Sequence, residues 1–223
     1  MKYLSIDIES TGLDEDCLLI EFAAIPFDTC MPLEKSLEHT LAFHSFIQCP
    51  SFELLRPKLN PWVAEHNESL IRKAASCNIT LATFGNNFKQ YLQSSPIKNY
   101  FLIKNENDQN KDQDKIVLFG KSLNAIDLPF LRRDLGSDFM NTFFLHKVMD
   151  LTAFAFGLID LNLLPEGVHS SSELMKHFKM GEVSHTALDD AKNTAIIYMR
   201  LLDYIKTQKL LHSSHITLPT TGL

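Results

Sequence analysis

Two acidic side chains, Asp7 and Glu9, interrupt the otherwise apolar stretch Tyr3–Glu9 near the start of the chain. The stretch has the composition of a buried strand, and side chains at positions i and i+2 of a strand point to the same side. The two acids would therefore share one face at the end of a core strand. Such a pair is costly unless a positive charge or a metal ion lies between the carboxylates.

Further acidic residues with the same potential lie far along the chain. Asp127 opens the amphipathic sequence DLPFLRRDL, and His185, Asp189 and Asp190 stand at the head of a long helical pattern. Asp190 falls in the small and apolar stripe of that pattern, whereas Asp189 aligns with polar residues. We therefore expect Asp190 to face the sheet, and Asp189 to face solvent and help cap the helix.

Four carboxylates with a histidine nearby and no thiolate indicate a site for hard divalent cations. Mg²⁺ and Mn²⁺ prefer oxygen ligands, and a zinc site fits this set of residues less well. Two such ions about 4 Å apart stabilise both the attacking and the leaving oxygen of a phosphoryl displacement. We therefore expect two ions, Mg²⁺ or Mn²⁺, held by Asp7, Glu9, Asp127 and Asp190.

Taken singly, each of these residues has a simpler interpretation. An aspartate at a strand end is often a cap, Asp127 alone is an ordinary acidic residue of a first helical turn, and His185 alone is an ordinary surface or capping histidine. The pairing of Asp7 with Glu9 inside an apolar strand favours ligands, because buried charge needs a partner. The three segments together favour a catalytic site over the simpler roles.

In these segments the sequence resembles the DEDDh family of 3′–5′ exonucleases, within the ribonuclease-H-like superfamily. The family's three motifs read DIESTGL at 7–13, NAIDLPFL at 124–131 and HTALDD at 185–190. Their order and spacing match over roughly residues 3–202. Three departures are visible. Ser10 stands where threonine is common, and the gap between Asn124 and Asp127 is shorter than usual. Lys121 with Ser122 replaces the His-Asn pair that precedes the second motif in several members.

The resemblance implies a role for each acidic residue. Asp7, Glu9 and Asp190 would hold the catalytic metal, Asp7 would also reach a second ion, and Asp127 would act through water. His185 would be the general base for the attacking water, which is consistent with an imidazole that titrates near neutral pH.

The resemblance also places the terminal nucleotide on the turn formed by Ser10, Thr11, Gly12 and Leu13. Thr11 and backbone N–H groups would lie near the 3′ end, and Leu13 would contact the base. Gly12 would permit close approach of the backbone.

Other residues have both a binding and a structural interpretation. Trp62 and His66 would stack on a nucleotide or simply pack within the fold. Asn124 would contact substrate as part of the second motif. Four basic side chains would contact phosphates or form a solvated surface: Lys121, Arg132, Arg133 and Lys192.

The elements that must position these residues follow from hydrophobic periodicity. We predict strands at 3–9, 17–28, 36–47, 115–120 and early in 143–157. We predict helices at 60–76, 80–93, 124–135, late in 143–157, at 170–181 and at 186–208. With the resemblance, this order predicts an α/β, ribonuclease-H-like fold: a central mixed five-stranded sheet, its second strand antiparallel, flanked by helices.

The length and composition of the chain limit the classes of function that it can have. The 223 residues, 45% of them hydrophobic, fit a single exonuclease domain at 1–211, with a polar insert near 104–115 and a flexible tail at 212–223. A net charge of −6 argues against a protein that coats long duplexes. The absence of a long apolar run and of a charged leader predicts no membrane span and no secretory signal, and four cysteines without a CxxC pair predict a cytoplasmic location.

We therefore expect a metal-dependent 3′–5′ exonuclease that releases 5′-mononucleotides from single-stranded or short DNA or RNA. The alternative is a polymerase-associated proofreading subunit, or a nucleic-acid-binding scaffold of the same fold. A homodimer, as is common in the family, and a polymerase or other protein partner are both compatible with the sequence. DNA and RNA are not distinguished, because that choice depends on contacts to the 2′-hydroxyl.

Overall fold

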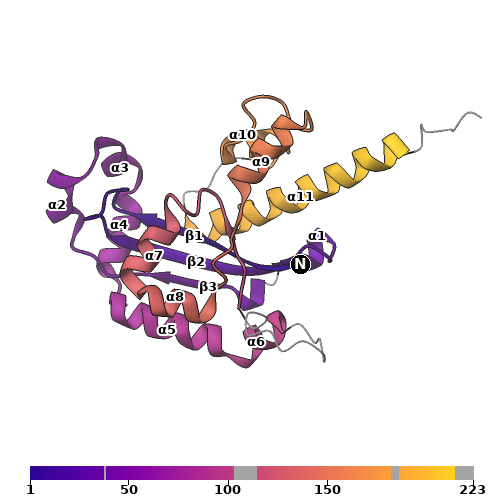
Figure 1. The fold of residues 1–223 in the computed structure, drawn as a ribbon. Helices are drawn as coiled ribbons and strands as arrows, with labels where there is room; N and C mark the ends of the chain where they lie inside the picture. The colour runs from indigo at the N-terminus through magenta and orange to yellow at the C-terminus, as the bar shows by residue number, and fades with distance from the viewer. Residues whose placement is uncertain (38, 103–114, 182–185, 214–223) are drawn as a thin grey trace, which may run out of the picture.

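A five-stranded mixed sheet forms the centre of the computed structural model, which describes residues 1–37, 39–102, 115–181 and 186–213 (Figure 1). The strand order is β3-β2-β1-β4-β5. The strands are β1 (Lys2–Ser10), β2 (Leu19–Asp28), β3 (Phe43–Phe46), β4 (Leu118–Gly120) and β5 (Met149–Asp150). β2 is antiparallel to β1 and β3, while β1, β4 and β5 are parallel. The predicted fold class is confirmed.

The two faces of β1 carry different kinds of side chain. Leu4, Ile6 and Ile8 are buried against α5 (Leu81–Gln93), α7 (Asp127–Leu135) and α8 (Ser137–Phe143), in a core that includes Phe84 and Phe88 of α5. Tyr3 and Ser5 face the other way, since Tyr3 packs against Tyr198 and the Ser5 hydroxyl donates to the Ala191 carbonyl at 2.7 Å. The alternation of a strand then places Asp7 and Glu9 on this second face.

The second face is covered by α9 (Leu151–Asp160), α10 (Ser171–His177) and α11 (Ala187–Ser213), which lie opposite α5, α7 and α8 (Figure 1). Small residues let α11 approach the sheet: Ala187 and Ala191 pack directly on Ala23 and Ile25 of β2. The predicted helix at 186–208 is thus found, and it continues to Ser213, so residues 212 and 213 belong to α11 rather than to the expected tail. Figure 1 shows its far end running beyond the sheet.

The predicted third strand at 36–47 is largely wrong. A short helix, α1 (Leu33–Ser36), and a 3₁₀ turn, η1 (His39–Leu41), precede β3, which spans only Phe43–Phe46. Pro32 stands at the N-cap of α1 and has no backbone N–H to give to a sheet. Apolar residues here are too mixed in spacing for periodicity to separate a strand from tight helical turns.

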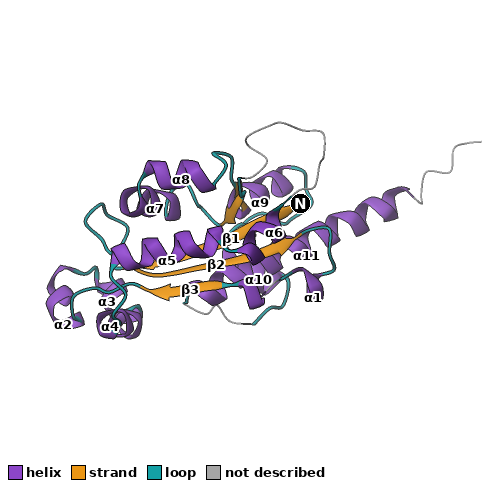
Figure 2. Ribbon diagram, turned by 90° about the horizontal axis from the view of Figure 1, so that it is seen from below, coloured by secondary structure: helices purple, strands orange, loops and turns teal. Residues whose placement is uncertain are grey.

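The predicted single helix at 60–76 is two helices, α3 (Pro61–His66) and α4 (Glu68–Ser76), joined at Asn67. Asn67 has non-helical backbone angles and a buried side chain whose amide donates to the Ser10 carbonyl at 3.3 Å. The break thus serves a contact with the end of β1. Ahead of α3 lie α2 (Phe52–Leu55) and the 3₁₀ turn η2 (Arg56–Lys58) (Figure 2).

The remaining differences concern three further helices and some element ends. α2, α6 (Ser95–Phe101) and α8 were not expected. For α6, the Ser94 N-cap with proline in the first turn is the signal that could have revealed it. The helix predicted at 124–135 begins at Asp127, and β4 and β5 are shorter than expected. Nearly all of the polar insert, at 103–114, and the tail at 214–223 lie outside the described residues. Within the described residues, no helix combines the length and hydropathy needed to cross a membrane.

Candidate active site

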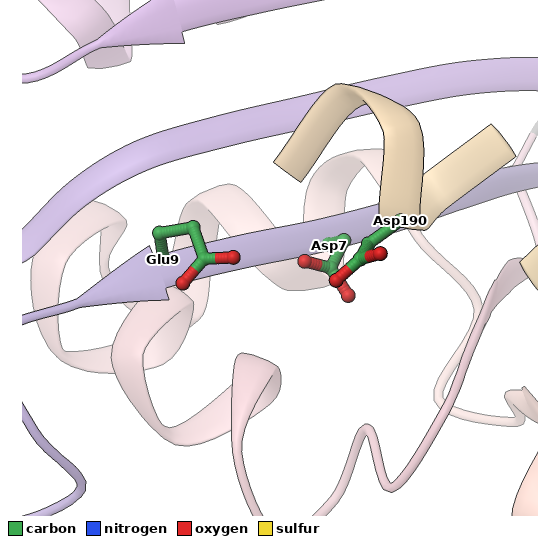
Figure 3. A group of neighbouring side chains, drawn as sticks. All are labelled: Asp7, Glu9 and Asp190. Carbon is green, nitrogen blue, oxygen red and sulfur yellow. The ribbon is translucent and has the colours of Figure 1, made fainter. Parts of the chain in front are cut away.

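Three acidic side chains from two distant parts of the chain meet on the α11 side of the sheet. Asp7 and Glu9 project from β1, and Asp190 projects from the first turn of α11 toward them (Figure 3). One carboxylate oxygen of each lies within 4.8 Å of the others. Asp7 and Asp190 are buried, whereas Asp189 is exposed and bonds to the Thr186 hydroxyl at 3.0 Å. The helical spacing therefore correctly distinguished Asp190 from Asp189.

Asp127 reaches the same cavity from α7, a helix that packs on the other face of the sheet. It is the first residue of α7, it is buried, and it lines the same cavity as the three acids, although it is not part of the close three-membered group. α7 follows β4, the parallel neighbour of β1, so the carboxyl ends of both strands deliver acids to one place. Asp127 thus lies in the same cavity as Asp7, Glu9 and Asp190.

Burial sets the electrostatics of these carboxylates. Loss of water raises the pKa of Asp7 well above its ordinary value, and Asp127, Asp190 and Glu9 raise it further, while Lys121 opposes the rise. Burial also raises the pKa of Glu9 to about 7, with added repulsion from Asp190. The cluster therefore carries more negative charge than the protein easily accommodates at neutral pH.

Asp127 shows the same balance. Burial raises its pKa to about 7, although the backbone N–H groups of Asp127 and Ile8 and the ammonium of Lys121 favour its charged form. The Lys121 Nζ lies 3.9 Å from Asp7 Oδ1 and 3.6 Å from Asp190 Oδ2. A set of buried oxygen ligands with excess negative charge fits a hard divalent cation, so the residues present match the metal that the sequence predicts.

Glu21 adds a further buried carboxylate that the sequence reasoning missed. It lies opposite Glu9 in the β1–β2 register, its side chain is 1% exposed, and its Oε1 lies 2.6 Å from His44 Nε2. Its Oε2 has no hydrogen-bond partner among the described residues. Glu21 raises the pKa of Glu9. An acid at that position looked like an ordinary strand residue, and only the register places it beside Glu9.

A cavity of about 580 Å³ opens over the carboxylates. Besides the acids Asp7, Glu9, Asp127 and Asp190, its walls include the turn after β1 and two residues of α3. The described residues that line it are Asp7, Ile8, Glu9, Ser10, Thr11, Gly12, Leu13, Asp14, Cys17, Lys58, Asn60, Trp62, Val63, Asn67, Lys121, Ile126, Asp127 and Asp190. Its size suits one nucleotide residue or a small fragment of a strand.

The turn Ser10–Leu13 forms one wall and is tightly constrained. The Thr11 hydroxyl accepts from the Leu18 N–H at 2.8 Å, and the Ser10 hydroxyl donates to the Gly12 carbonyl at 2.6 Å. Gly12 has a φ of 152°, and a Cβ there would lie 2.7 Å from Cys17 Sγ. Leu13 is 71% exposed and available for a contact. All four residues of the predicted nucleotide turn therefore line the cavity.

Of the other three predicted binding residues, one lines the cavity and two do not. Trp62 lines the cavity and is 54% exposed, and the ring of His66 stacks on it with centroids 4.3 Å apart. His66 itself and the exposed Asn124 are not among the residues that line the cavity. His185, the predicted base, lies outside the described residues.

Three residues contribute to the site in ways that the sequence did not predict. Asn67 holds the end of β1, Lys58 lines the cavity, and Lys121 pairs with the acids instead of joining a solvated surface. Arg133 is placed differently again: its Nη1 donates to the carbonyls of Glu15 and Cys17 at 2.7 and 2.9 Å and ties α7 to the loop after β1.

No family profile and no curated protein matches the chain by sequence. Solved structures do match its fold. The nuclease domain of 3′hExo, described as a DEDDh family member bound to rAMP, aligns with a TM-score of 0.59 and 14% identity, over 91% of this chain and 92% of that domain. The chain has the fold of the DEDDh 3′-exonucleases.

Two further solved structures also align with the chain. Cell-death related nuclease 4 (CRN-4) aligns with a TM-score of 0.60 and 14% identity, over 91% of this chain and 64% of that one. Exonuclease I of E. coli, in complex with a 5cy-dA13 oligonucleotide, aligns with a TM-score of 0.51 and 16% identity, over 92% and 43%. The chain thus spans less than two thirds of both nucleases, and the likeness to them concerns the fold alone.

Proposed function

We propose that the protein is a metal-dependent 3′–5′ exonuclease. It would hydrolyse the terminal phosphodiester of single-stranded or short nucleic acid and release 5′-mononucleotides. The observation that carries the proposal is the convergence of Asp7, Glu9 and Asp190 in one cavity, within the fold of the DEDDh 3′-exonucleases. The cavity wall formed by the turn after β1 supports it, since a strand end placed there would lie against the carboxylates.

The acidic residues would act as metal ligands. Asp7, Glu9 and Asp190 would hold Mg²⁺ or Mn²⁺, and Asp127 would complete the ligand set for a second ion. When bound, these cations would stabilise the negative charge that develops on the attacking and leaving oxygens. The burial of Asp7 and Asp190 favours this role, because a buried carboxylate without a cation is costly.

His185 would serve as the general base, and the cavity wall would hold the substrate. His185 would accept the proton of the attacking water and return it to solvent; in the sequence it stands five residues before Asp190, as the third motif of the resemblance requires. The backbone of Ser10–Leu13 would hold the 3′-terminal nucleotide, and Trp62 would offer a ring for stacking.

Short or single strands are the substrates that this surface favours. A net charge of −6 repels the phosphates of a long duplex, so binding would depend on the cavity. Similar structures include a 3′-exonuclease described as recognising the 3′ end of a histone mRNA stem-loop, and an exonuclease bound to a DNA oligonucleotide. Both polymers therefore belong in the test. A cytoplasmic location, a homodimer and a polymerase partner are further proposals.

The decisive experiment incubates the protein with Mn²⁺ and matched 5′-labelled DNA and RNA oligonucleotides, single and double stranded. We expect products that shorten one nucleotide at a time from the 3′ end. Asp7→Asn should abolish cleavage while the fold is retained, as far-UV circular dichroism would show, because the amide preserves shape but is a poor metal ligand. His185→Ala should lower the rate by about 10²- to 10⁴-fold and leave Mn²⁺ affinity almost unchanged.

Robust cleavage by Asp7→Asn would exclude this assignment. Cuts at internal positions would instead indicate an endonuclease. Tight binding of the oligonucleotide by the wild-type protein with no cleavage would favour the scaffold alternative.

A further inference from the structure

Lys121 places a positive charge inside the acidic cluster. It directly follows β4, its side chain is 31% exposed, and its Nζ lies 3.9 Å from Asp7 Oδ1 and 3.6 Å from Asp190 Oδ2. It also lines the cavity. A lysine on an ordinary solvated surface would not lie within ion-pair distance of two buried acids from different elements.

The turn that carries Lys121 is braced on both sides. Before it, Gly120 packs so closely that a Cβ would lie 2.5 Å from Leu123 Cδ2 and 3.0 Å from the Ile6 carbonyl oxygen. After it, Ser122 has a φ of 52°, and the Leu123 N–H donates to Asp150 Oδ2 at 2.8 Å. The backbone at Lys121 is therefore fixed, and its ammonium is directed to the cluster by a preformed turn.

The charges around Lys121 keep it protonated. A lysine ammonium is charged at neutral pH, and the carboxylate oxygens of Asp7 and Asp190 within 4 Å of its Nζ favour that charged form. At neutral pH the cluster thus contains an ammonium group beside two of the carboxylates proposed to bind metal. An ammonium and a divalent cation repel each other and compete for the same oxygen atoms.

We propose that Lys121 is a built-in counter-ion of the active site: its ammonium neutralises Asp7 and Asp190 in the metal-free protein, and a divalent cation displaces it on binding. The inference rests on the proposed metal site and adds a residue that controls its occupancy. Lys121 stabilises the metal-free fold and weakens metal binding. The chain would thereby fold without metal and load the ion reversibly.

The test measures Mn²⁺ binding to metal-free protein by isothermal titration calorimetry at pH 7.5. Lys121→Met removes the charge and keeps most of the chain length, so we expect Mn²⁺ to bind about tenfold more tightly. Lys121→Arg keeps the charge and should bind like the wild type. Lys58→Met is the matched control, because Lys58 lines the same cavity without an ion pair to these acids among the described residues.

Melting temperatures with and without Mn²⁺ provide a second measurement. Metal-free Lys121→Met should melt several degrees below the wild type, and saturating Mn²⁺ should abolish the difference. A purely structural role for Lys121 would instead lower the melting temperature in both conditions and leave Mn²⁺ affinity unchanged. If Lys121→Met fails to fold without metal, Lys121→Gln and refolding in Mn²⁺ give the same comparison.

Unchanged or weaker Mn²⁺ binding by Lys121→Met would overturn the inference. The Asp7→Asn variant separates this result from a failure of the metal site itself. If the wild type binds Mn²⁺ and Asp7→Asn does not, the metal site stands, and the Lys121 result decides the role of the lysine alone. If neither protein binds Mn²⁺, both the metal site and the counter-ion are overturned.

Discussion

Glu9 illustrates how a single residue in this cluster is held in an unfavourable state. Its carboxylate is partly buried and lies near Asp190 and Glu21, so its pKa rises to about 7. Glutamate in an unfolded chain titrates near 4.5. The acids of the cluster therefore destabilise the fold when they are charged. The ammonium of Lys121, beside Asp7 and Asp190, reduces the repulsion among them.

The pH dependence of stability tests this balance. Between pH 4.5 and about 7 the folded protein holds a proton on Glu9 that the unfolded chain has lost. The free energy of unfolding of metal-free protein should therefore fall as pH rises through this window, by up to about 1.4 kcal/mol per pKa unit. Thermal melts in EDTA from pH 4.5 to 8 measure the slope.

Glu9→Gln is the matched variant for that measurement. It removes one titrating group, so its stability should fall less steeply with pH, while Asp7 and Asp127 keep part of the slope. With saturating Mn²⁺ the wild type should instead gain stability as pH rises, because metal binding favours the deprotonated carboxylates. A metal-free Glu9→Gln slope equal to that of the wild type would contradict the shifted pKa.

At the scale of elements, the turn between β4 and α7 decides where two functional groups lie, the Lys121 ammonium and the Asp127 carboxylate. It sets Lys121 beside Asp7 and starts the helix that carries Asp127, and its geometry depends on the contact of Gly120 with Leu123 and Ile6. Asp150, the N-cap of α9, holds the same turn through the Leu123 N–H. The site is therefore supported by two neighbouring parallel strands.

Gly120→Ala should disrupt this turn. Its Cβ would meet a backbone oxygen that cannot move cheaply, so we expect a loss of about 1–3 kcal/mol in the free energy of unfolding and weaker Mn²⁺ binding. Gly157→Ala is the control, because Gly157 lies in α9 with no atom near the new Cβ and alanine is the better helix former. Urea unfolding and calorimetry compare the two. Equal stability of the two variants would rule out the close packing at Gly120.

For the whole molecule, charge predicts a weak dependence of substrate binding on salt. The net charge is −6, and among the described residues the only basic side chains that line the cavity are Lys58 and Lys121. Lys121 is already paired with Asp7 and Asp190. With about one phosphate of a single strand neutralised by Lys58, the logarithm of the binding constant should fall against the logarithm of salt concentration with a slope of about −0.7.

Fluorescence anisotropy of a 5′-labelled single-stranded oligonucleotide with Asp7→Asn protein measures this slope, because the variant should not cleave its ligand. Lys58→Met should make the slope shallower by about 0.7. A slope steeper than about −3 would indicate a basic binding surface outside the cavity.

The sequence by itself determined which acidic residues form the cluster of this protein and the outline of its fold. Asp7 and Glu9 were recognisable because two acids in an apolar strand contradict burial, and Asp190 because helical spacing separates it from Asp189. The order of strands and helices predicted the mixed sheet, since adjacent strands with short connections pair antiparallel and later ones alternate with helices. These are local patterns, and local physics is sufficient to produce them.

Only the tertiary structure decided what surrounds those acids. Lys121 became a partner of Asp7 and Asp190, and Glu21 a neighbour of Glu9, through strand pairing between segments whose separation in sequence carries no signal. Asn67 ends a helix because its amide holds the Ser10 carbonyl, a contact that helical periodicity cannot show. Charge and hydrogen-bond partners depend on distances in space, so the balance of this site was set when the sheet and α11 came together.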